Sequence, residues 1–370
     1  MPAIPALRRP LAVLAVLPLF VLAACGYGSR APEDDAVRIP AGAVRTDGLD
    51  SVRIGYFANV THATALVAAR KGFFQGALGG TRATYQVFGS GPAEIEALNS
   101  GSVDIGWIGP SPAVNGYTRS GGRNLRIVSG SVSGGVKLVV DPERIRSPRD
   151  VRGKRIATPQ LGNTQDVALL DWIDRQGWSV DAQSGKGDVS VIRTDDKVVP
   201  DAYRSGAIDG AWVPEPTASM LVAEGAKVLL DEASLWPGHS FATTNVVVSQ
   251  SFLEEHPKAV EAVLKASVET NAWIGSHPEE ARAAANEQLA KDVGKPLPAD
   301  VLDPAWESVR VTDDPLAATL AAQADHAVRA GLLKRPELAG IYDLTLLNRV
   351  LRARGQPAVG DAGLGAEQAA

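Results

Sequence analysis

Two segments of the chain repeat one pattern of residues. Residues 97–113 read ALNSGSVDIGWIGPSPA and residues 202–218 read AYRSGAIDGAWVPEPTA, so that Ala, Ser, Gly, Asp and Trp coincide without a gap. Each copy is typical of a helix end, a Ser-Gly turn, a short buried strand ending in Trp and a Pro-containing helix start. The alternative is chance convergence of two common strand-turn-helix units. The repeat predicts two lobes built on one plan, and a looser echo between residues 59–63 and 163–167 points the same way.

Short apolar runs alternate with amphipathic stretches around this repeat, which favours an α/β fold with mainly parallel sheets flanked by helices. Strands are predicted at residues 52–57, 84–88, 103–108, 125–130, 137–140 and 155–158. Helices are predicted between them at residues 61–71, 92–100 and 164–176. After about Val248 the pattern becomes helical, with predicted helices at residues 257–275, 278–289, 316–331 and 342–354.

The first 24 residues resemble a signal peptide. Arg8 and Arg9 precede an apolar run, residues 10–24, that is too short to span a bilayer. The run ends in Leu22-Ala23-Ala24-Cys25, which resembles a lipobox, so we expect Cys25 to be lipidated and to anchor the exported protein to the outer face of the cytoplasmic membrane. The alternative is that Cys25 merely lies in an ordinary signal peptide. Residues 25–49 are predicted to be a flexible tether, and residues 356–370 a disordered tail.

The composition excludes several function classes. The formal net charge is −5 with interspersed signs, so no basic stripe offers a surface to nucleic acid. Cys25 is the only cysteine, and the five histidines lack the spacing of metal ligands, so neither a disulfide, a metal site nor a cofactor is expected. The sequence contains no nucleophile elbow, Walker loop or dinucleotide fingerprint. We therefore expect a small-molecule partner and no catalysis.

Loops that lead from a strand into a helix are the expected ligand site, because ligands of open α/β sheets bind beyond the carboxyl ends of the strands. Backbone N–H groups of a first helical turn, with capping hydroxyl or amide groups, bind anions without a lysine. The alternative for each polar residue is that it only caps its own helix. The predicted ligand-binding residues in these loops are Asn59, Thr61, His62, Ser90, Gly91, Gly109, Pro110, Ser111, Gln160, Asn163, Thr164 and Gln165.

Three further residues come from the repeat itself. Trp107 and Trp212 occupy equivalent strand ends, from which they would face a ligand from opposite lobes, unless they pack in the cores. Glu215 stands where the first copy has Pro110, and the flanking prolines Pro214 and Pro216 are expected to expose its carboxylate. A carboxylate beside an anion site predicts a zwitterionic ligand, unless Glu215 is a solvated loop residue or an interlobe salt-bridge partner.

The chain resembles the periplasmic binding proteins of nitrate, sulfonate and taurine importers. The resemblance covers roughly residues 52–355. It depends on motifs such as Arg53-Ile-Gly-Tyr-Phe57, Phe88-Gly-Ser-Gly-Pro92, Gly101-Ser-Val-Asp104, Val151-Arg-Gly-Lys-Arg-Ile-Ala157, Gly206-Ala-Ile-Asp-Gly-Ala-Trp212 and Glu215-Pro216. The sequence departs from the sulfonate pattern at residues 160–165 and at Glu215, where an Asp is usual.

The resemblance implies the two-lobed, type II periplasmic-binding-protein fold. Lobe 1 would comprise residues 50–136 plus 245–355 and lobe 2 residues 137–244, with residues 137–140 and 244–248 as two hinge crossovers. Hinge closure would capture a small organic anion or zwitterion, and the ABC permease and ATPase subunits of an importer would be the partners. A monomer fits this mechanism. The alternatives are a ligand-sensing lipoprotein that signals through a membrane partner, or an enzyme similar to pyrimidine-precursor synthases on the same fold.

Overall fold

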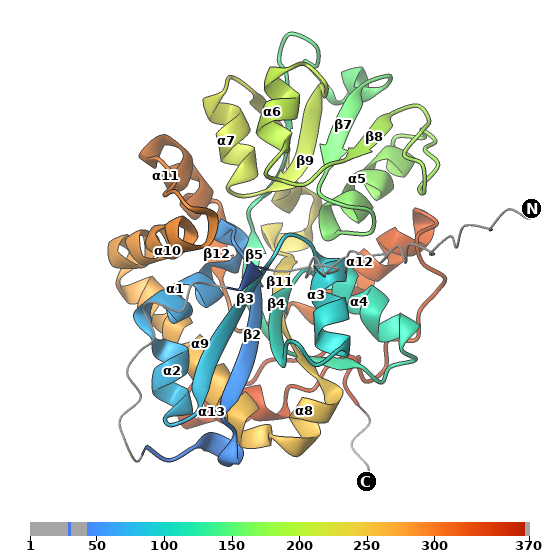
Figure 1. Ribbon diagram of the computed structural model, residues 1–370. Helices are drawn as coiled ribbons and strands as arrows, with labels where there is room; N and C mark the ends of the chain where they lie inside the picture. Colours follow the sequence, from blue (N-terminus) through green and yellow to red (C-terminus); the bar gives the residue numbers. More distant parts are fainter. Residues whose placement is uncertain (1–28, 31–42, 367–370) are drawn as a thin grey trace, which may run out of the picture.

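The computed structural model describes residues 29–30 and 43–366, and within them the chain forms two lobes around two separate β-sheets (Figure 1). The larger sheet has seven strands in the order β1-β3-β2-β4-β11-β5-β12, and the smaller has five in the order β10-β6-β9-β7-β8. We call the bodies around these sheets lobe 1 and lobe 2. Helices cover both sheets, so the predicted two-lobed α/β fold is confirmed.

Lobe 1 contains both ends of the described chain. Its strands are β1 (Ser29–Arg30), β2 (Ser51–Phe57), β3 (Arg82–Phe88), β4 (Ile105–Ile108), β5 (Leu125–Gly134), β11 (Ala242–Ser249) and β12 (Val309–Val311). Its helices are α1 (Ala63–Lys71), α2 (Phe73–Leu78), α3 (Gly91–Asn99), α4 (Pro110–Arg119), α8 (Gln250–Glu255), α9 (Pro257–Ser276), α10 (Pro278–Val293), α11 (Ala299–Glu307), α12 (Ala317–Arg329) and α13 (Thr345–Ala353).

Lobe 2 is one continuous stretch of chain. Its strands are β6 (Val136–Val140), β7 (Arg155–Thr158), β8 (Ser190–Arg193), β9 (Gly210–Pro214) and β10 (Lys227–Asp231). Its helices are α5 (Thr164–Arg175), α6 (Val199–Arg204) and α7 (Thr217–Ala223).

The chain crosses between the lobes twice. It leaves lobe 1 between β5 and β6, at Gly134 and Gly135, both of which have positive φ. It returns between β10 and β11. The segments expected as crossovers, residues 137–140 and 244–248, lie within β6 and β11, directly beyond these passages.

The sheets are mixed, so the prediction of mainly parallel sheets is wrong. Parallel pairing joins β2 to β3 and β4, and β7 to β8 and β9. The strands next to the crossings are antiparallel to their neighbours, because β11 pairs with β4 and β5, and β6 pairs with β9 and β10. A strand that enters a sheet from the other lobe does not need the right-handed helical crossover of a parallel unit.

The repeat seen in the sequence has the same backbone in both lobes. Gly101 and Gly206 end α3 and α6 with φ of +70° and +69°. The N–H groups of the next two residues donate to the carbonyl of Ala97 in lobe 1 and of Ala202 in lobe 2. This helix-ending turn needs a residue with positive φ, which explains the Gly in each copy.

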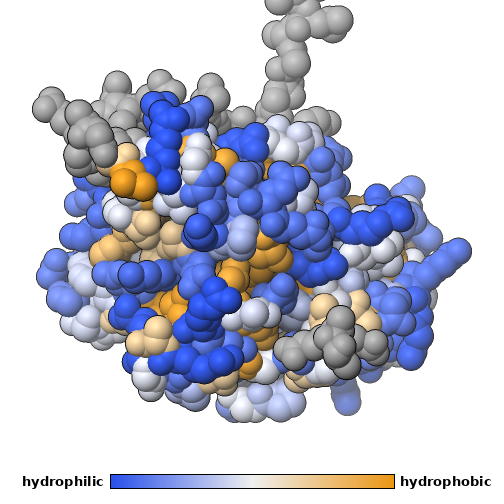
Figure 2. Space-filling model, turned by 90° about the horizontal axis from the view of Figure 1, so that it is seen from below, coloured by the Kyte–Doolittle hydropathy of each residue, from blue (hydrophilic) through white to orange (hydrophobic). Residues whose placement is uncertain are grey.

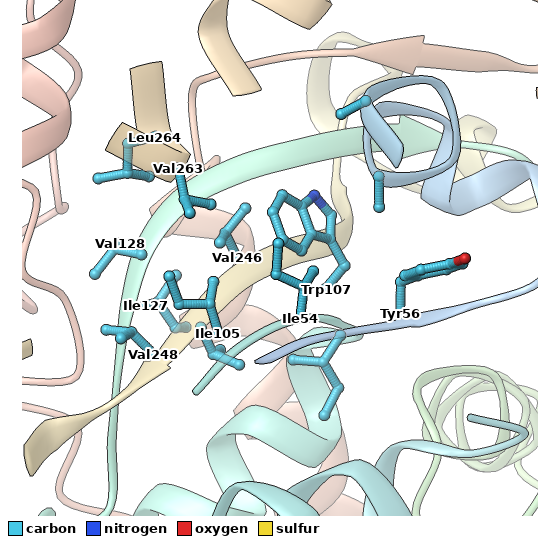
Figure 3. Packing of buried hydrophobic residues seen from close by; sticks show 14 of the residues in the cluster. Ile54, Tyr56, Ile105, Trp107, Ile127, Val128, Val246, Val248, Val263 and Leu264 are labelled. Carbon is cyan, nitrogen blue, oxygen red and sulfur yellow. The ribbon is translucent and has the colours of Figure 1, made fainter. Parts of the chain in front are cut away.

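The core of lobe 1 lies beneath β2, β4, β5 and β11. Ile54, Ile105, Trp107 and Val246 are almost wholly buried there, close to Val263 of α9 (Figure 3). Seen from below, the outer face of the molecule is mainly hydrophilic, with apolar residues in the gaps (Figure 2). Within residues 29–30 and 43–366, no helix combines the length and the apolar character that crossing a bilayer requires.

The ends of the described chain correct two expectations. Residues 43–49 belong to lobe 1 rather than to a free tether, because Thr46 N–H donates to Thr81 Oγ1 and Asp47 Oδ2 accepts from Ala259 N–H. The expected disordered tail is wrong as far as Ala366, since the Asn348 side chain binds the backbone of Val359 and the N–H of Ala366 donates to the carbonyl of Tyr342. The predicted signal peptide and Cys25 lie outside the described residues, as do residues 367–370.

Candidate functional site

A small cavity lies between the lobes. Its volume is about 30 Å³, which is room for about one or two water molecules. Both lobes contribute to its wall. The lining residues are Phe57, Asn59, Thr61, His62, Gly89, Gly109, Pro112, Pro159, Asn163, Thr164, Gln165, Asp196, Pro214, Thr243 and Thr244.

Helix N-termini meet at this cavity. Gly109 is the residue before α4, Asn163 is the residue before α5, and Thr164 is the first residue of α5. Gly89 lies just ahead of α3, and Thr61 lies in the short 3₁₀ helix that leads into α1. The first N–H groups of a helix have no partner within it and carry partial positive charge, so these ends favour an anion or an acceptor group.

His62 is buried against the cavity as a neutral imidazole. Burial lowers the pKa of His62 to about 3. Its Nδ1 accepts a hydrogen bond of 3.2 Å from the N–H of Phe57, whose ring stacks on the imidazole at 4.6 Å between centroids. The ring proton is therefore on Nε2, which makes His62 a neutral donor and not a cation.

The lobes touch directly beside the cavity. The N–H of Gly91, in lobe 1, donates to Asn163 Oδ1 of lobe 2 at 3.3 Å, and the N–H of Val60 donates to the carbonyl of Glu215 at 3.2 Å. Farther out, Arg329 of α12 forms an ion pair of 2.6 Å with Asp171 of α5. These contacts hold the lobes in a closed arrangement, which is why the cavity is small.

Glu215 corrects the sequence prediction. Its side chain is fully buried, whereas the flanking prolines were expected to expose it. Oε1 is 2.6 Å from Nζ of Lys137 on the neighbouring strand β6, and Oε2 accepts from Ser219 N–H at 3.0 Å. A helix N-terminus and a lysine thus hold the carboxylate inside, and Lys137 also donates to Ser308 Oγ of lobe 1 at 2.6 Å.

Trp107 and Trp212 are also placed differently from the expectation of two ring faces across a ligand. Both are fully buried in their own lobes, and neither lines the cavity. The ring of Trp107 packs on that of Phe74, with 5.2 Å between centroids, in the core of lobe 1. Figure 3 shows Trp107 among the aliphatic side chains of this core. Trp212 donates from Nε1 to Glu232 Oε2 at 2.7 Å. Each strand turns its Trp toward the helices that cover the sheet, because this is where large apolar side chains are buried.

The remaining predicted residues divide into two groups. Asn59, Thr61, His62, Gly109, Asn163, Thr164 and Gln165 line the cavity together. Ser90, Gly91, Pro110 and Ser111 lie at the same helix starts but are not among the lining residues, and Gln160 is exposed on the loop before α5.

Sequence reasoning missed the cavity residue Asp196. It lies in the loop between β8 and α6, and β8 was not predicted because its Ser190-Val-Ile-Arg193 run is short and partly exposed. The polar triplet Thr194-Asp195-Asp196 directly follows this strand. Polar residues at a strand end are the signal by which the sequence could have indicated Asp196. Thr243 and Thr244 were missed as well, since Thr244 was assigned only to a hinge crossover and Thr243 only to the end of lobe 2.

No group of three or more His, Cys, Asp or Glu side chains suited to a metal ion is present in the described ranges, 29–30 and 43–366.

A family model described as the NMT1-like family matches residues 46–290. The taurine-binding periplasmic protein of Escherichia coli (strain K12) is 28% identical over 200 residues, which are 54% of this chain and 60% of that protein. A Bacillus subtilis protein named for binding aliphatic sulfonates is 24% identical over 353 residues, 93% of this chain and 97% of that one.

Among solved structures, the alkanesulfonate-binding protein of Xanthomonas axonopodis pv. citri bound to MOPS is similar, with a TM-score of 0.64 and 22% identity. The match covers 78% of this chain and 96% of that chain. At this identity the likeness shows the fold. With the family match, it confirms the resemblance that the sequence motifs indicate.

Proposed function

Because the chain belongs to the NMT1-like family, we propose that it is an exported solute-binding protein that captures a small organic anion or zwitterion, such as a sulfonate, and delivers it to an ABC importer. The ligand would bind in the cavity between the lobes. Relatives named for taurine and aliphatic sulfonates support this substrate class. The protein would bind its ligand without catalysis.

The observation that carries the proposal is the convergence of helix starts from both lobes on one cavity. Gly109 and Thr61 reach it from lobe 1, and Thr164 from lobe 2. An anion placed there would receive donors from both lobes at once, so its binding would favour the closed state. Because the present cavity has a volume of only about 30 Å³, the lobes must separate before an organic ligand enters.

The membrane anchor is part of the same proposal. Cys25 would be lipidated after removal of residues 1–24 and would hold the protein at the outer face of the cytoplasmic membrane, where the permease and ATPase partners are reached. Labelling cells with a fatty-acid analogue tests this point. Label in the wild type that disappears in Cys25→Ala supports the anchor, whereas equal label in both contradicts it.

A thermal-shift screen tests ligand capture. A ligand that binds only the native state raises the melting temperature as ln(1 + [L]/Kd). The panel contains taurine, alkanesulfonates, nitrate, sulfate, carboxylates and neutral compounds, each also incubated alone to detect turnover. A shift confined to anions or zwitterions supports the proposal, and a shift confined to neutral compounds contradicts it.

Thr164→Val sharpens the test. The side chain of Thr164 is only 5% exposed and its Oγ1 lacks a partner among the described residues, so a bound ligand is its natural partner. We expect Thr164→Val to weaken anion binding by about tenfold. Thr217→Val is the control, because Thr217 is the first residue of α7 and is buried, but does not line the cavity.

A further inference from the structure

The polar side chains of the cavity differ in whether a ligand can use them. Asn59 Oδ1 accepts from Thr61 Oγ1 at 2.6 Å, and Thr244 Oγ1 donates to the Thr61 carbonyl at 2.8 Å. Thr243 Oγ1 donates to the Gly134 carbonyl at 2.7 Å. These groups are already engaged within the protein.

Two lining residues have a buried atom without a partner among the described residues. They are Thr164, through Oγ1, and Asp196, through Oδ1. Buried polar groups in native proteins are almost always hydrogen-bonded, and an unpaired buried carboxylate is especially costly. Thr164 can donate to an anion, but a carboxylate can only accept. A ligand that pairs with both residues must therefore bring an acceptor to Thr164 and a donor to Asp196.

Adjacent aspartates in this loop have separate tasks. Asp195 shapes the turn, because its Oδ1 accepts from Lys197 N–H at 2.9 Å and its carbonyl accepts from Val198 N–H at 2.8 Å. Asp196 is half-buried, and its buried Oδ1 has no partner among the described residues. Burial, and then the charge of Asp195, raise the pKa of Asp196 to about 7. A nearby cation would relieve this cost.

Glu215 cannot perform this role. It was the residue from which the sequence predicted a zwitterionic ligand, but its two oxygens are occupied by Lys137 and by Ser219 N–H. Its charge is balanced within the protein, so a ligand gains nothing from it. Among the described residues that line the cavity, the carboxylate with a buried, unpartnered oxygen is that of Asp196.

We propose that Asp196 is a specificity residue that binds the ammonium group of a small zwitterion whose anionic group lies at the N-terminus of α5, beside Thr164. The inference rests on the proposed function. With Asp196 in place, the cleft selects a ligand with both charges and disfavours a plain anion, because the carboxylate repels an anion that brings no cation of its own.

Matched ligand pairs test the assignment. Taurine and ethanesulfonate differ only in the ammonium group, as do β-alanine and propionate. The full-length protein is titrated calorimetrically with all four compounds, as wild type, as Asp196→Asn and as Asp195→Asn. Asparagine keeps the size of the side chain, and Asp195→Asn is a control for the loop. The melting temperature without ligand shows whether each variant folds.

For the wild type, we expect the zwitterion of at least one pair to bind more tightly than its plain anion. In Asp196→Asn this preference should fall by about tenfold to a hundredfold, the scale of a hydrogen bond to a charged group, and plain-anion binding should improve. Asp195→Asn should keep the preference. The unliganded Asp196→Asn protein should melt at or above the wild-type temperature.

The contradictory outcomes are distinct. If the wild type binds plain anions as well as zwitterions, or if Asp196→Asn folds and keeps the wild-type preference, Asp196 is not the ammonium site and anion capture stands. If the wild type binds none of the four compounds but binds another anion of the screen with an affinity that Asp196→Asn leaves unchanged, the inference again fails alone. If it binds no anion or zwitterion at all, the proposed function and the inference fail together.

Discussion

The repeated units of the two lobes share a backbone but differ at their buried polar positions. In lobe 1, Asp104 accepts from the N–H of Arg53 at 2.7 Å, and in lobe 2 Asp209 accepts from the N–H of Arg155 at 2.9 Å. Each aspartate joins the first strand of its unit to the loop after the helix. The shared residues of the repeat therefore maintain the architecture, and they explain why the echo is visible in the sequence.

The differences lie at residues that pack against the last strand of each unit, β4 or β9, and at residues that follow this strand. In lobe 1 the carboxyl of Glu94 is buried next to Gly55 and Gly106. The register of the parallel strands places Ala157 and Ala211 at the corresponding positions of lobe 2, where Val199 of α6 packs in the same cluster. After the strand, lobe 1 has Pro110, while lobe 2 has Glu215 paired with Lys137. Residues that differ between equivalent positions are therefore not needed for the backbone that the two units share.

Breaking the Lys137–Glu215 pair should have the largest effect. Lys137→Met leaves a fully buried carboxylate without its cation, which costs about 3–5 kcal/mol of unfolding free energy. Urea denaturation measures the change. Lys227→Met, on the exposed neighbouring strand, should cost less than about 0.5 kcal/mol. The double variant Lys137→Met with Glu215→Gln should recover much of the loss, and no recovery would show that packing, not charge, is responsible.

The shared aspartates should have similar, smaller effects. Asp104→Asn weakens the hydrogen bonds from Arg53 and should cost about 2 kcal/mol in urea denaturation. Asp209→Asn weakens those from Arg155 and Arg144 and should cost about as much or slightly more. A large inequality between the two would contradict the common role.

Asp209 also predicts a pH dependence. Burial alone would raise the pKa of Asp209, but hydrogen bonds from Arg155 and Arg144 bring it below its ordinary value. The stabilisation is present above the unfolded pKa of about 3.9 and is lost as pH falls through the native value. Stability measured from pH 6 to pH 3 should therefore decline less in Asp209→Asn than in the wild type.

Glu94→Gln should have a smaller effect of opposite sign. Burial raises the pKa of Glu94 well above its ordinary value, and neither oxygen has a partner among the described residues. Stability is full below the unfolded pKa of about 4.3 and falls as pH rises toward the native pKa. Glu94→Gln should remove this decline and gain about 1 kcal/mol at pH 8. Glu96→Gln, exposed on the same helix, is the control, and an equal gain there would refute the explanation.

The looser echo gives the smallest expected effect. Asn59 binds within lobe 1, whereas Asn163 binds Gly91 across the cleft. Asn163→Ala should therefore lower the population of the closed form and weaken ligand binding about fivefold, the scale of one hydrogen bond. Calorimetry gives the affinity, and small-angle scattering the change in compactness. A variant as compact as the wild type, with unchanged affinity, would argue against this contact as a latch.

Features that depend on local sequence patterns could be predicted, whereas contacts between residues far apart in the chain could not. The strands and helices around the repeat follow from periodicity and from the Gly and Pro positions, and seven of the predicted site residues line the cavity. The burial of Glu215 could not be predicted, because its partner Lys137 is far away in the chain and becomes its neighbour only through the pairing of β6 with β9. Asp196 was missed because β8, the strand that precedes its loop, is short and carries little apolar signal.

The position of β11 in the larger sheet determines when each lobe can be completed during synthesis. β11 separates β4 from β5, although it follows all of lobe 2 in the chain. Lobe 2 has all its strands once residue 231 has emerged, whereas lobe 1 lacks a central strand until residue 249. On the ribosome, lobe 2 can therefore fold first. Until β11 has been made, the edges of β4 and β5 remain unpaired, so they can pair with another chain unless a chaperone covers them.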